Sequence, residues 1–252
     1  MQGEGSRHLD WSIFQFRWQP SAELALVVLT WIAVVAGLWT AFQGFTTQRV
    51  ALNFITFGPI SIFGLGVAVP ILLIIRNGRS LKAVGITSSR AVLSIVLSLL
   101  FAVIQYTQTM AGVGLPALDR VIPLVTMALA VGLFEAIFFR GWIQLRLEAA
   151  FGAIPGICFG SLFYALYHVG HGMAPGEIAF LFVIGLIYAV VFRLTRNILI
   201  LWPFLTPMGG LFSNIKDGLT LPFEATYGFL LVLGLMFAFI LSVTVYMRRK
   251  AC

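Results

Sequence analysis

Long apolar segments separated by short polar connections dominate the chain. An apolar run of about 20 residues is long enough to cross the hydrocarbon core of a bilayer as a helix. We predict eight such segments, at about 22–43, 52–75, 91–113, 122–149, 156–170, 176–193, 198–213 and 228–246. The pattern therefore predicts an all-α, polytopic membrane bundle of about eight transmembrane helices.

The polar connections and interruptions indicate the domain organisation. Residues 1–20 interleave aromatic and polar side chains, which is typical of a segment at the membrane interface. The remaining chain, 21–252, has the length of a single transmembrane domain. Pro203, Pro207 and the Gly209–Gly210 pair interrupt the seventh apolar segment, so we expect a broken helix there.

Composition and charge narrow the class of protein. The chain is 60% hydrophobic and 10% charged, whereas a soluble domain is about half apolar and a quarter charged. Its net charge of +7 comes from basic residues at segment ends rather than from one patch, so we expect no nucleic-acid partner. Of the 16 basic residues, 12 fall on the side of both termini and 3 on the other, with Arg140 inside a segment. This bias predicts cytoplasmic termini. We expect the membrane to be a bacterial-type inner or plasma membrane.

Glu135 differs from the other acidic residues in its position. Of the nine acids, eight lie at or near the ends of apolar segments, and only Glu135 lies where we expect burial within the membrane. A charge at that depth costs roughly 3 kcal/mol or more, so an intramembrane acid indicates a function. In an α-helix successive residues are rotated by about 100°, so Ala136 and Arg140 share one helix face. Glu135 is rotated by one residue, about 100°, from Ala136.

The fifth segment carries the polar groups expected to face Glu135. Tyr164 and His168 are four residues apart on one helix face, and His171 follows three residues later. Glu135 and His168 are therefore expected to meet across a helix pair, where a carboxylate takes a proton from water and imidazole orients or relays it. We expect no cofactor and no metal, because His168, His171 and Glu135 lack a fourth ligand.

These residues stand in motifs that resemble those of the CPBP family, the membrane group of CAAX prenyl endopeptidases and bacteriocin-processing proteases. The family's first motif is Glu-Glu-x-x-x-Arg, and the chain has Glu135 and Arg140 with Ala136 in place of the second Glu. Its second motif is Phe-x-x-x-His, and the chain has His168 with Tyr164 in place of Phe. The resemblance covers a core of about 76–214.

The family's third motif, His-x-x-x-Asn, is missing. Met208 stands at the His position and Phe212 at the Asn position, while Asn214 lies two residues late. In the family these two side chains steady the developing oxyanion, and one such donor is worth about 10²–10³ in rate. The expected substitutes are Arg140, Tyr164, Tyr167, His171 and Asn214.

The resemblance implies an intramembrane endopeptidase of the glutamic type. Glu135 and His168 would activate water to cleave a membrane-associated peptide or protein tail, with membrane lipid as the surroundings. The competing hypothesis is a catalytically degenerate member that serves as a binding or assembly subunit of a larger membrane complex. A small-molecule carrier is less favoured, because the sequence has no internal repeat.

Purely structural roles also remain open for each candidate residue. Glu135 and Arg140 can form a buried ion pair that pins helices together. His168 can be a hydrogen-bonded residue at a helix end, and His171 a solvated loop residue. Met208, Phe212 and the Gly209–Gly210 pair can serve close helix packing.

Overall fold

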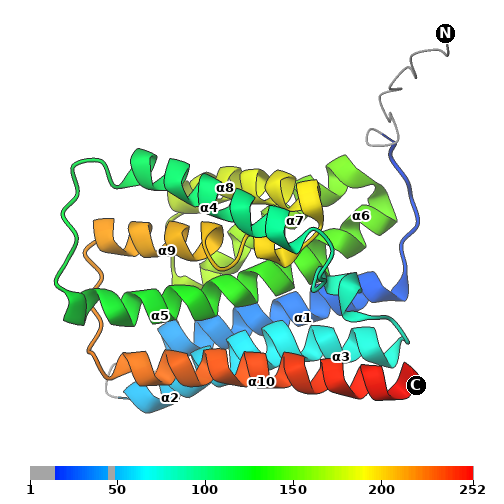
Figure 1. Ribbon diagram of the computed structural model, residues 1–252, viewed down its shortest axis with the longest axis horizontal. Coiled ribbons are helices and arrows are strands. Elements are labelled where there is room, and N and C mark those ends of the chain that lie inside the picture. The colour runs from blue at the N-terminus through cyan, green and yellow to red at the C-terminus, as the bar shows by residue number, and fades with distance from the viewer. Residues whose placement is uncertain (1–14, 45–48, 252) are drawn as a thin grey trace, which may run out of the picture.

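The computed structural model describes residues 15–44 and 49–251, which form a bundle of roughly aligned helices (Figure 1). The described chain is 81% helical and contains no strand. Eight of its helical segments are long and apolar enough to cross a membrane: Ala22–Gly44, Val50–Arg76, Ala91–Thr109, Leu118–Phe151, Ala153–His171, Pro175–Thr195, Ile198–Lys216 and Ala225–Lys250. The prediction of an all-α polytopic bundle is confirmed, and the protein is an integral membrane protein.

Several helix types combine to make these segments. The α-helices of the described ranges are α1 (Ala22–Trp39), α2 (Val50–Ile55), α3 (Val69–Arg76), α4 (Ala91–Thr109), α5 (Leu118–Glu135), α6 (Leu145–Phe151), α7 (Ala153–Leu166), α8 (Pro175–Thr195), α9 (Leu205–Lys216) and α10 (Ala225–Ala251). The π-helical stretches are η2 (Thr40–Gly44), η3 (Thr56–Ala68) and η5 (Ala136–Gln144). The 3₁₀ turns are η4 (Leu81–Val84), η6 (Tyr167–His171) and η7 (Ile198–Ile200). The predicted break in the seventh segment is found at Pro203, where a turn at 201–204 separates η7 from α9. The interruption expected at Pro207 and Gly209–Gly210 is wrong, because α9 is continuous through them.

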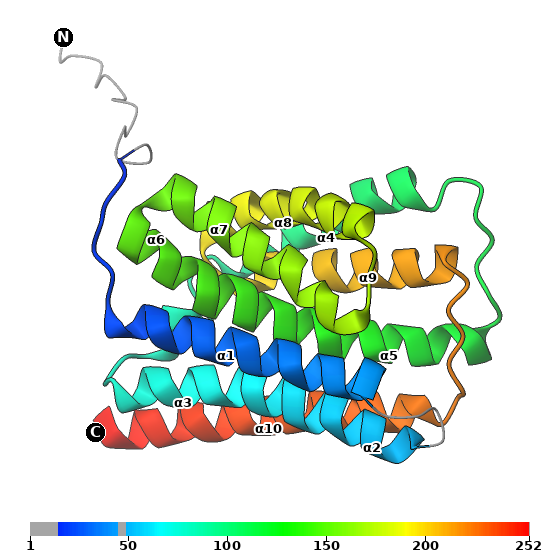
Figure 2. The same cartoon turned by 180° about the vertical axis from the view of Figure 1, so that it is seen from behind.

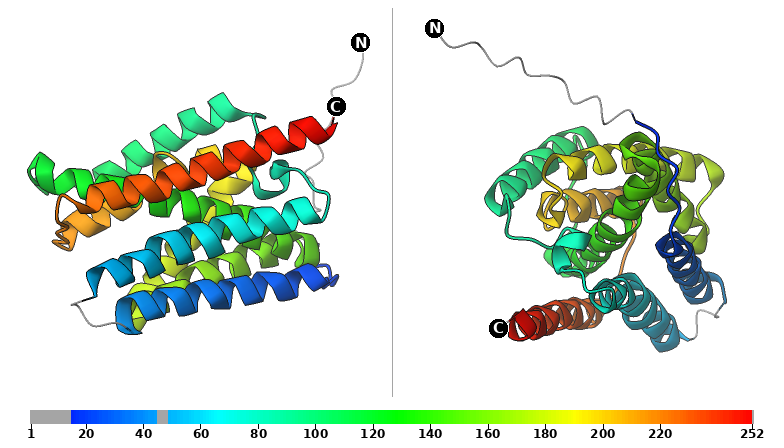
Figure 3. Two further views of the ribbon diagram at one scale, coloured as in Figure 1. Left: turned by 90° about the horizontal axis from the view of Figure 1, so that it is seen from below. Right: turned by 90° about the vertical axis from the view of Figure 1, so that its right-hand side faces the viewer.

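One continuous segment, made of α5, η5 and α6, runs through the middle of the bundle (Figures 1 and 3). Helices α9 and α10 pack on α5, while α7 packs on η5 and α6. On the opposite face of the bundle, α1 lies beside η3 and η6 (Figure 2). The central segment has the largest buried share of the eight spans, 67%, so most of its side chains meet protein.

Two glycines let neighbouring elements approach this central segment. A methyl group at Gly132 would lie 2.7 Å from Cγ of Pro207, so α9 packs against the bare backbone of α5. A methyl group at Gly141 would overlap the backbone carbonyl of Val84, which ends η4. Small residues at such crossings are the usual means of close helix packing in membranes.

The described part of the N-terminal segment, residues 15–20, runs in extended form past the end of α6. The Arg17 amide donates to the Phe151 carbonyl at 3.1 Å, and the Gln19 amide donates to Ala150 at 2.9 Å. Residues 1–14 of the predicted interfacial segment 1–20 lie outside the described residues. The beginning of α1 and the end of α10 lie at the same end of the bundle (Figure 1), as an even number of spans requires.

Candidate active site

Glu135 is buried at the junction between α5 and η5, with 8% of its surface exposed. Its Oε1 accepts a hydrogen bond from the hydroxyl of Tyr167, which η6 supplies. Among the described residues no ion pair involves Glu135. The carboxylate is thus held by a neutral phenol, and the ion pair with Arg140 considered above is not formed as a direct contact.

Arg140 lies in the π-helical stretch, which the assumption of a regular α-helix did not anticipate. A π-helix forms i→i+5 hydrogen bonds, so the faces assigned above at about 100° per residue do not hold across 136–144. Arg140 is 2% exposed, and its guanidinium carbon lies 5.1 Å from the centre of the Tyr164 ring. Its Nη1 lies 3.5 Å from Gln144 Oε1, and its Nη2 has no hydrogen-bond partner among the described residues.

A cavity of about 410 Å³ opens between α5, α7, η6, α8 and α9. A volume of this order is that of a site for a small ligand or a short stretch of peptide. Six of the predicted site residues line it, namely Glu135, Tyr164, Tyr167, His168, His171 and Asn214. Arg140 does not line the cavity and reaches it only through its contact with the Tyr164 ring.

His168 lies in η6, directly after α7, and is 6% exposed. Its Nδ1 lies 3.1 Å from the carbonyl oxygen of Tyr164, an acceptor that requires the proton on Nδ1. The Tyr167 ring, at 4.0 Å between ring centres, lies against the His168 ring and hydrogen-bonds Glu135. The structure therefore places Glu135 and His168 in one cavity with Tyr167 as the side chain that contacts both.

His171 also faces the cavity rather than bulk solvent. Its ring centre lies 5.6 Å from that of His168 and 4.8 Å from that of Phe42 in η2. Its Nδ1 is buried without a hydrogen-bond partner among the described residues. The interpretation of His171 as a solvated loop residue does not describe this environment.

Sequence reasoning missed a polar pair in the cavity lining. Gln105 Nε2 in α4 donates to the hydroxyl of Tyr188 in α8 at 3.1 Å, and both side chains line the cavity. Gln105 Oε1 and the Thr206 hydroxyl are buried there without partners among the described residues. The signal was present in the sequence, because Gln105 is an uncharged polar residue within an apolar span.

This pair lies against α9, the helix in which the third family motif would stand. A methyl group at Gly209 would overlap both the Tyr188 hydroxyl and Gln105 Nε2, so the bare backbone after Met208 makes room for them. Phe212 is 5% exposed and packs against the Tyr106 ring at 5.4 Å between centres. The two missing polar side chains are thus replaced by apolar packing, with polar groups arriving from α4 and α8.

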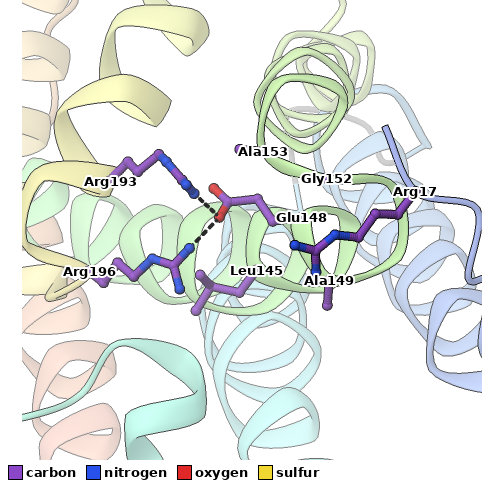
Figure 4. A pocket seen from close by; sticks show the side chains of 8 residues that line it. All are labelled: Arg17, Leu145, Glu148, Ala149, Gly152, Ala153, Arg193 and Arg196. Carbon is purple, nitrogen blue, oxygen red and sulfur yellow. Dashed lines mark hydrogen bonds and ion pairs between the residues drawn. The ribbon is translucent and has the colours of Figure 1, made fainter. Parts of the chain in front are cut away.

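A second buried carboxylate, Glu148, lies at the end of the same central segment and is also 8% exposed. Burial in the protein therefore does not separate Glu135 from Glu148, and the greater membrane depth expected of Glu135 stays a prediction. Glu148 Oε2 accepts from Arg193 at 2.5 Å and from Arg196 at 2.9 Å (Figure 4). Its Oε1 accepts from Gln144 Nε2 at 2.9 Å, and Gln144 in turn contacts Arg140.

The described residues contain no group of three or more His, Cys, Asp or Glu side chains that could hold a metal ion.

A family model described as Type II CAAX prenyl endopeptidase Rce1-like matches residues 116–204. The resemblance to the CPBP family is confirmed. The Rce1-like match covers Glu135, Arg140, Tyr164 and His168, and it ends before Met208 and Phe212. The wider core of 76–214 stays a prediction, and no curated protein and no solved structure matches the chain.

Proposed function

We propose that the protein is an intramembrane endopeptidase that uses Glu135 and His168 to activate water. The observation that carries this proposal is the buried Glu135 carboxylate, which faces a cavity shared with His168 and forms no ion pair within the described residues. The Rce1-like match supports a CAAX-type protease as the class. The substrate would be a peptide or the tail of a membrane-associated protein, because the cavity lies within the spans.

In the proposed mechanism Tyr167 fixes the carboxylate while Glu135 acts as the base. The Tyr167 hydroxyl occupies Glu135 Oε1, so Oε2 remains to accept a proton from water. The hydroxide adds to the carbonyl carbon of the scissile peptide bond and gives a tetrahedral oxyanion. The proton passes to the leaving nitrogen as the carbon–nitrogen bond breaks, giving a new carboxylate and a new amine. His168 carries its proton on Nδ1, so its Nε2 has a lone pair to orient the water.

We further propose that Tyr188 supplies the oxyanion donor that the missing third motif would have given. Its hydroxyl oxygen accepts from Gln105, which leaves the hydroxyl hydrogen to donate into the cavity. A fixed donor in a site shielded from water is worth about 10²–10³ in rate. Arg140 would act indirectly, by positioning Tyr164, because its guanidinium contacts the Tyr164 ring and does not line the cavity.

The charge bias of the chain supports a topology for the enzyme. With both termini in the cytoplasm of a bacterial-type inner or plasma membrane, the end of the bundle that holds Arg193, Arg196 and Arg248 is cytoplasmic. The cavity lining includes Met173, just after the span Ala153–His171, and Lys216, the last residue of the span Ile198–Lys216. Both span ends are opposite to the end that holds these arginines. We therefore expect substrate to enter from the non-cytoplasmic half of the bilayer.

One observation favours the competing function of a binding or assembly subunit, namely that Met208 and Phe212 replace both polar residues of the third motif. The test compares native membranes that contain the wild type, Glu135→Gln or His168→Ala, with mass spectrometry of protein termini and of co-purifying chains. Enzymatic function predicts a polypeptide that stays uncut only in the two variants. Stoichiometric partners that co-purify equally with all three proteins, with no terminus changed, would establish the subunit instead.

A further inference from the structure

A second pocket, of about 310 Å³, lies beside α6, which ends the central segment (Figure 4). It is formed where α6 ends, α7 begins and α8 ends, and residue 17 of the N-terminal segment closes one side. Three arginines line it, Arg17, Arg193 and Arg196, together with the single carboxylate of Glu148. The lining therefore carries an excess of two positive charges.

Glu148 uses only a small part of the donors that these arginines offer. Each guanidinium has five N–H donors in a planar fork that matches phosphate and carboxylate oxygens. Glu148 Oε2 takes one donor from Arg193 and one from Arg196. Arg17 approaches from the other side of the pocket (Figure 4), and no ion pair of the described residues includes it.

The surroundings place this pocket at the level of lipid headgroups. Phe16 and Trp18, on either side of Arg17, are 64% and 71% exposed, and aromatic rings of this kind gather at the membrane–water interface. The three spans that border the pocket end at Phe151, begin at Ala153 and end at Thr195. Helix α7 also begins in the pocket wall at Ala153, with no side-chain cap on its free amides.

We propose that Arg17, Arg193 and Arg196 bind the phosphate group of an anionic ligand at this end of the bundle. Guanidinium groups bind phosphate oxygens in pairs of hydrogen bonds, and basic pockets between transmembrane helices on the cytoplasmic side hold anionic headgroups. The phosphate can come from the headgroup of a membrane lipid or from a soluble ion, and both present the same oxygens. The site does not depend on the proposed proteolysis.

The test measures binding rather than activity. The double variant Arg17→Gln/Arg196→Gln removes two arginines and leaves Arg193 to neutralise the buried Glu148. The matched control is Arg248→Gln/Arg249→Gln, which removes the same charge from the exposed last turn of α10 at the same end of the bundle. Size-exclusion profiles and circular dichroism of all three proteins establish that each is folded.

Native mass spectrometry of the detergent-solubilised proteins, titrated with phosphatidylglycerol or phosphatidylcholine, gives the lipid arm. We expect the wild type and the control to bind phosphatidylglycerol in preference to phosphatidylcholine, and the double variant to bind it about fivefold more weakly for each arginine removed. A second experiment tests soluble phosphate: the proteins are titrated with inorganic phosphate, and binding is measured as a rise in the temperature of thermal unfolding. Arginine-dependent binding in that experiment alone would assign the site to a soluble phosphate. Equal binding by the double variant and the control in both experiments would overturn the proposal.

Discussion

Glu135 and Glu148 lie on one continuous helical segment and are equally shielded from solvent, at 8% exposure each, yet their partners differ. Glu148 contacts two guanidinium groups and a glutamine amide. Glu135 contacts a single phenol and faces a cavity. Burial alone therefore does not mark a reactive acid. A carboxylate that cations already neutralise serves structure, whereas one that faces space for substrate and water is available as a base.

The largest difference between the two acids is expected in catalysis. Glu135→Gln removes the proposed base and should lower turnover of a cleaved peptide by about 10²–10⁴-fold. Glu148→Gln is the matched control, because it makes the same chemical change on the same segment, and its turnover should stay within about threefold of the wild type. Peptide cleavage by purified protein in lipid nanodiscs measures both. Equal losses in the two variants would mean that Glu135 acts only through folding.

The Tyr188 hydroxyl in the cavity lining should contribute the next largest effect. Tyr188→Phe removes the proposed oxyanion donor and should lower kcat by about 10²–10³-fold while KM changes little. Tyr106→Phe is the matched control, because that ring packs on Phe212 and does not line the cavity. Unchanged kcat in Tyr188→Phe would remove Tyr188 from the mechanism.

The phenol that holds Glu135 should matter less than either group. Tyr167→Phe removes the hydrogen bond to Oε1 and keeps the ring that packs on His168. The carboxylate then loses its fixed orientation, and we expect kcat to fall about tenfold, as for the loss of one hydrogen bond to a charged group. Steady-state kinetics would compare Tyr167→Phe, Glu135→Gln and the variant that combines both substitutions. They show whether the combined variant has a lower kcat than Glu135→Gln alone. Any additional loss would contradict a role that runs through Glu135.

Glu148→Gln should have the smallest effect on turnover and the largest effect on the free energy of unfolding. Glu148→Gln leaves Arg193 and Arg196 without an anion and should lower the free energy of unfolding by about 1–3 kcal/mol, a value limited by the partial exposure of both arginines. Glu135→Gln still accepts from Tyr167, so its unfolding free energy should change by less than about 1 kcal/mol. Unfolding in mixed detergent measures both, and the reverse order would contradict the assignment of Glu148 to structure.

Hydrophobic patterning was sufficient to predict the architecture. Apolar length predicts each span, because backbone polar groups in a bilayer must be satisfied within helices. It also predicted the break at Pro203 before α9, but not that α9 continues through Pro207. The π-helical form of 136–144, where η5 packs against η4 and α7, was not predictable in this way, because apolar length does not distinguish i→i+5 from i→i+4 hydrogen bonding.

Motif spacing predicted which residues gather at the site and missed how they contact one another. Glu135, Tyr164, His168, His171 and Asn214 all line one cavity. The place of Tyr167, in contact with both Glu135 and His168, follows from the change of α7 into the 3₁₀ turn η6. Gln105 and Tyr188 come from two helices with no motif, so only their three-dimensional packing brings them to α9.

The central claim is that Glu135 delivers water to a peptide bond, and isotope labelling tests it directly. Purified wild type, Glu135→Gln and Glu148→Gln in nanodiscs would be given a cleavable membrane peptide in water enriched in oxygen-18. We expect the wild type and Glu148→Gln to place the label in the new carboxyl group, and Glu135→Gln to give no labelled product above the uncatalysed level. Labelled product from Glu135→Gln at the wild-type rate would contradict the account.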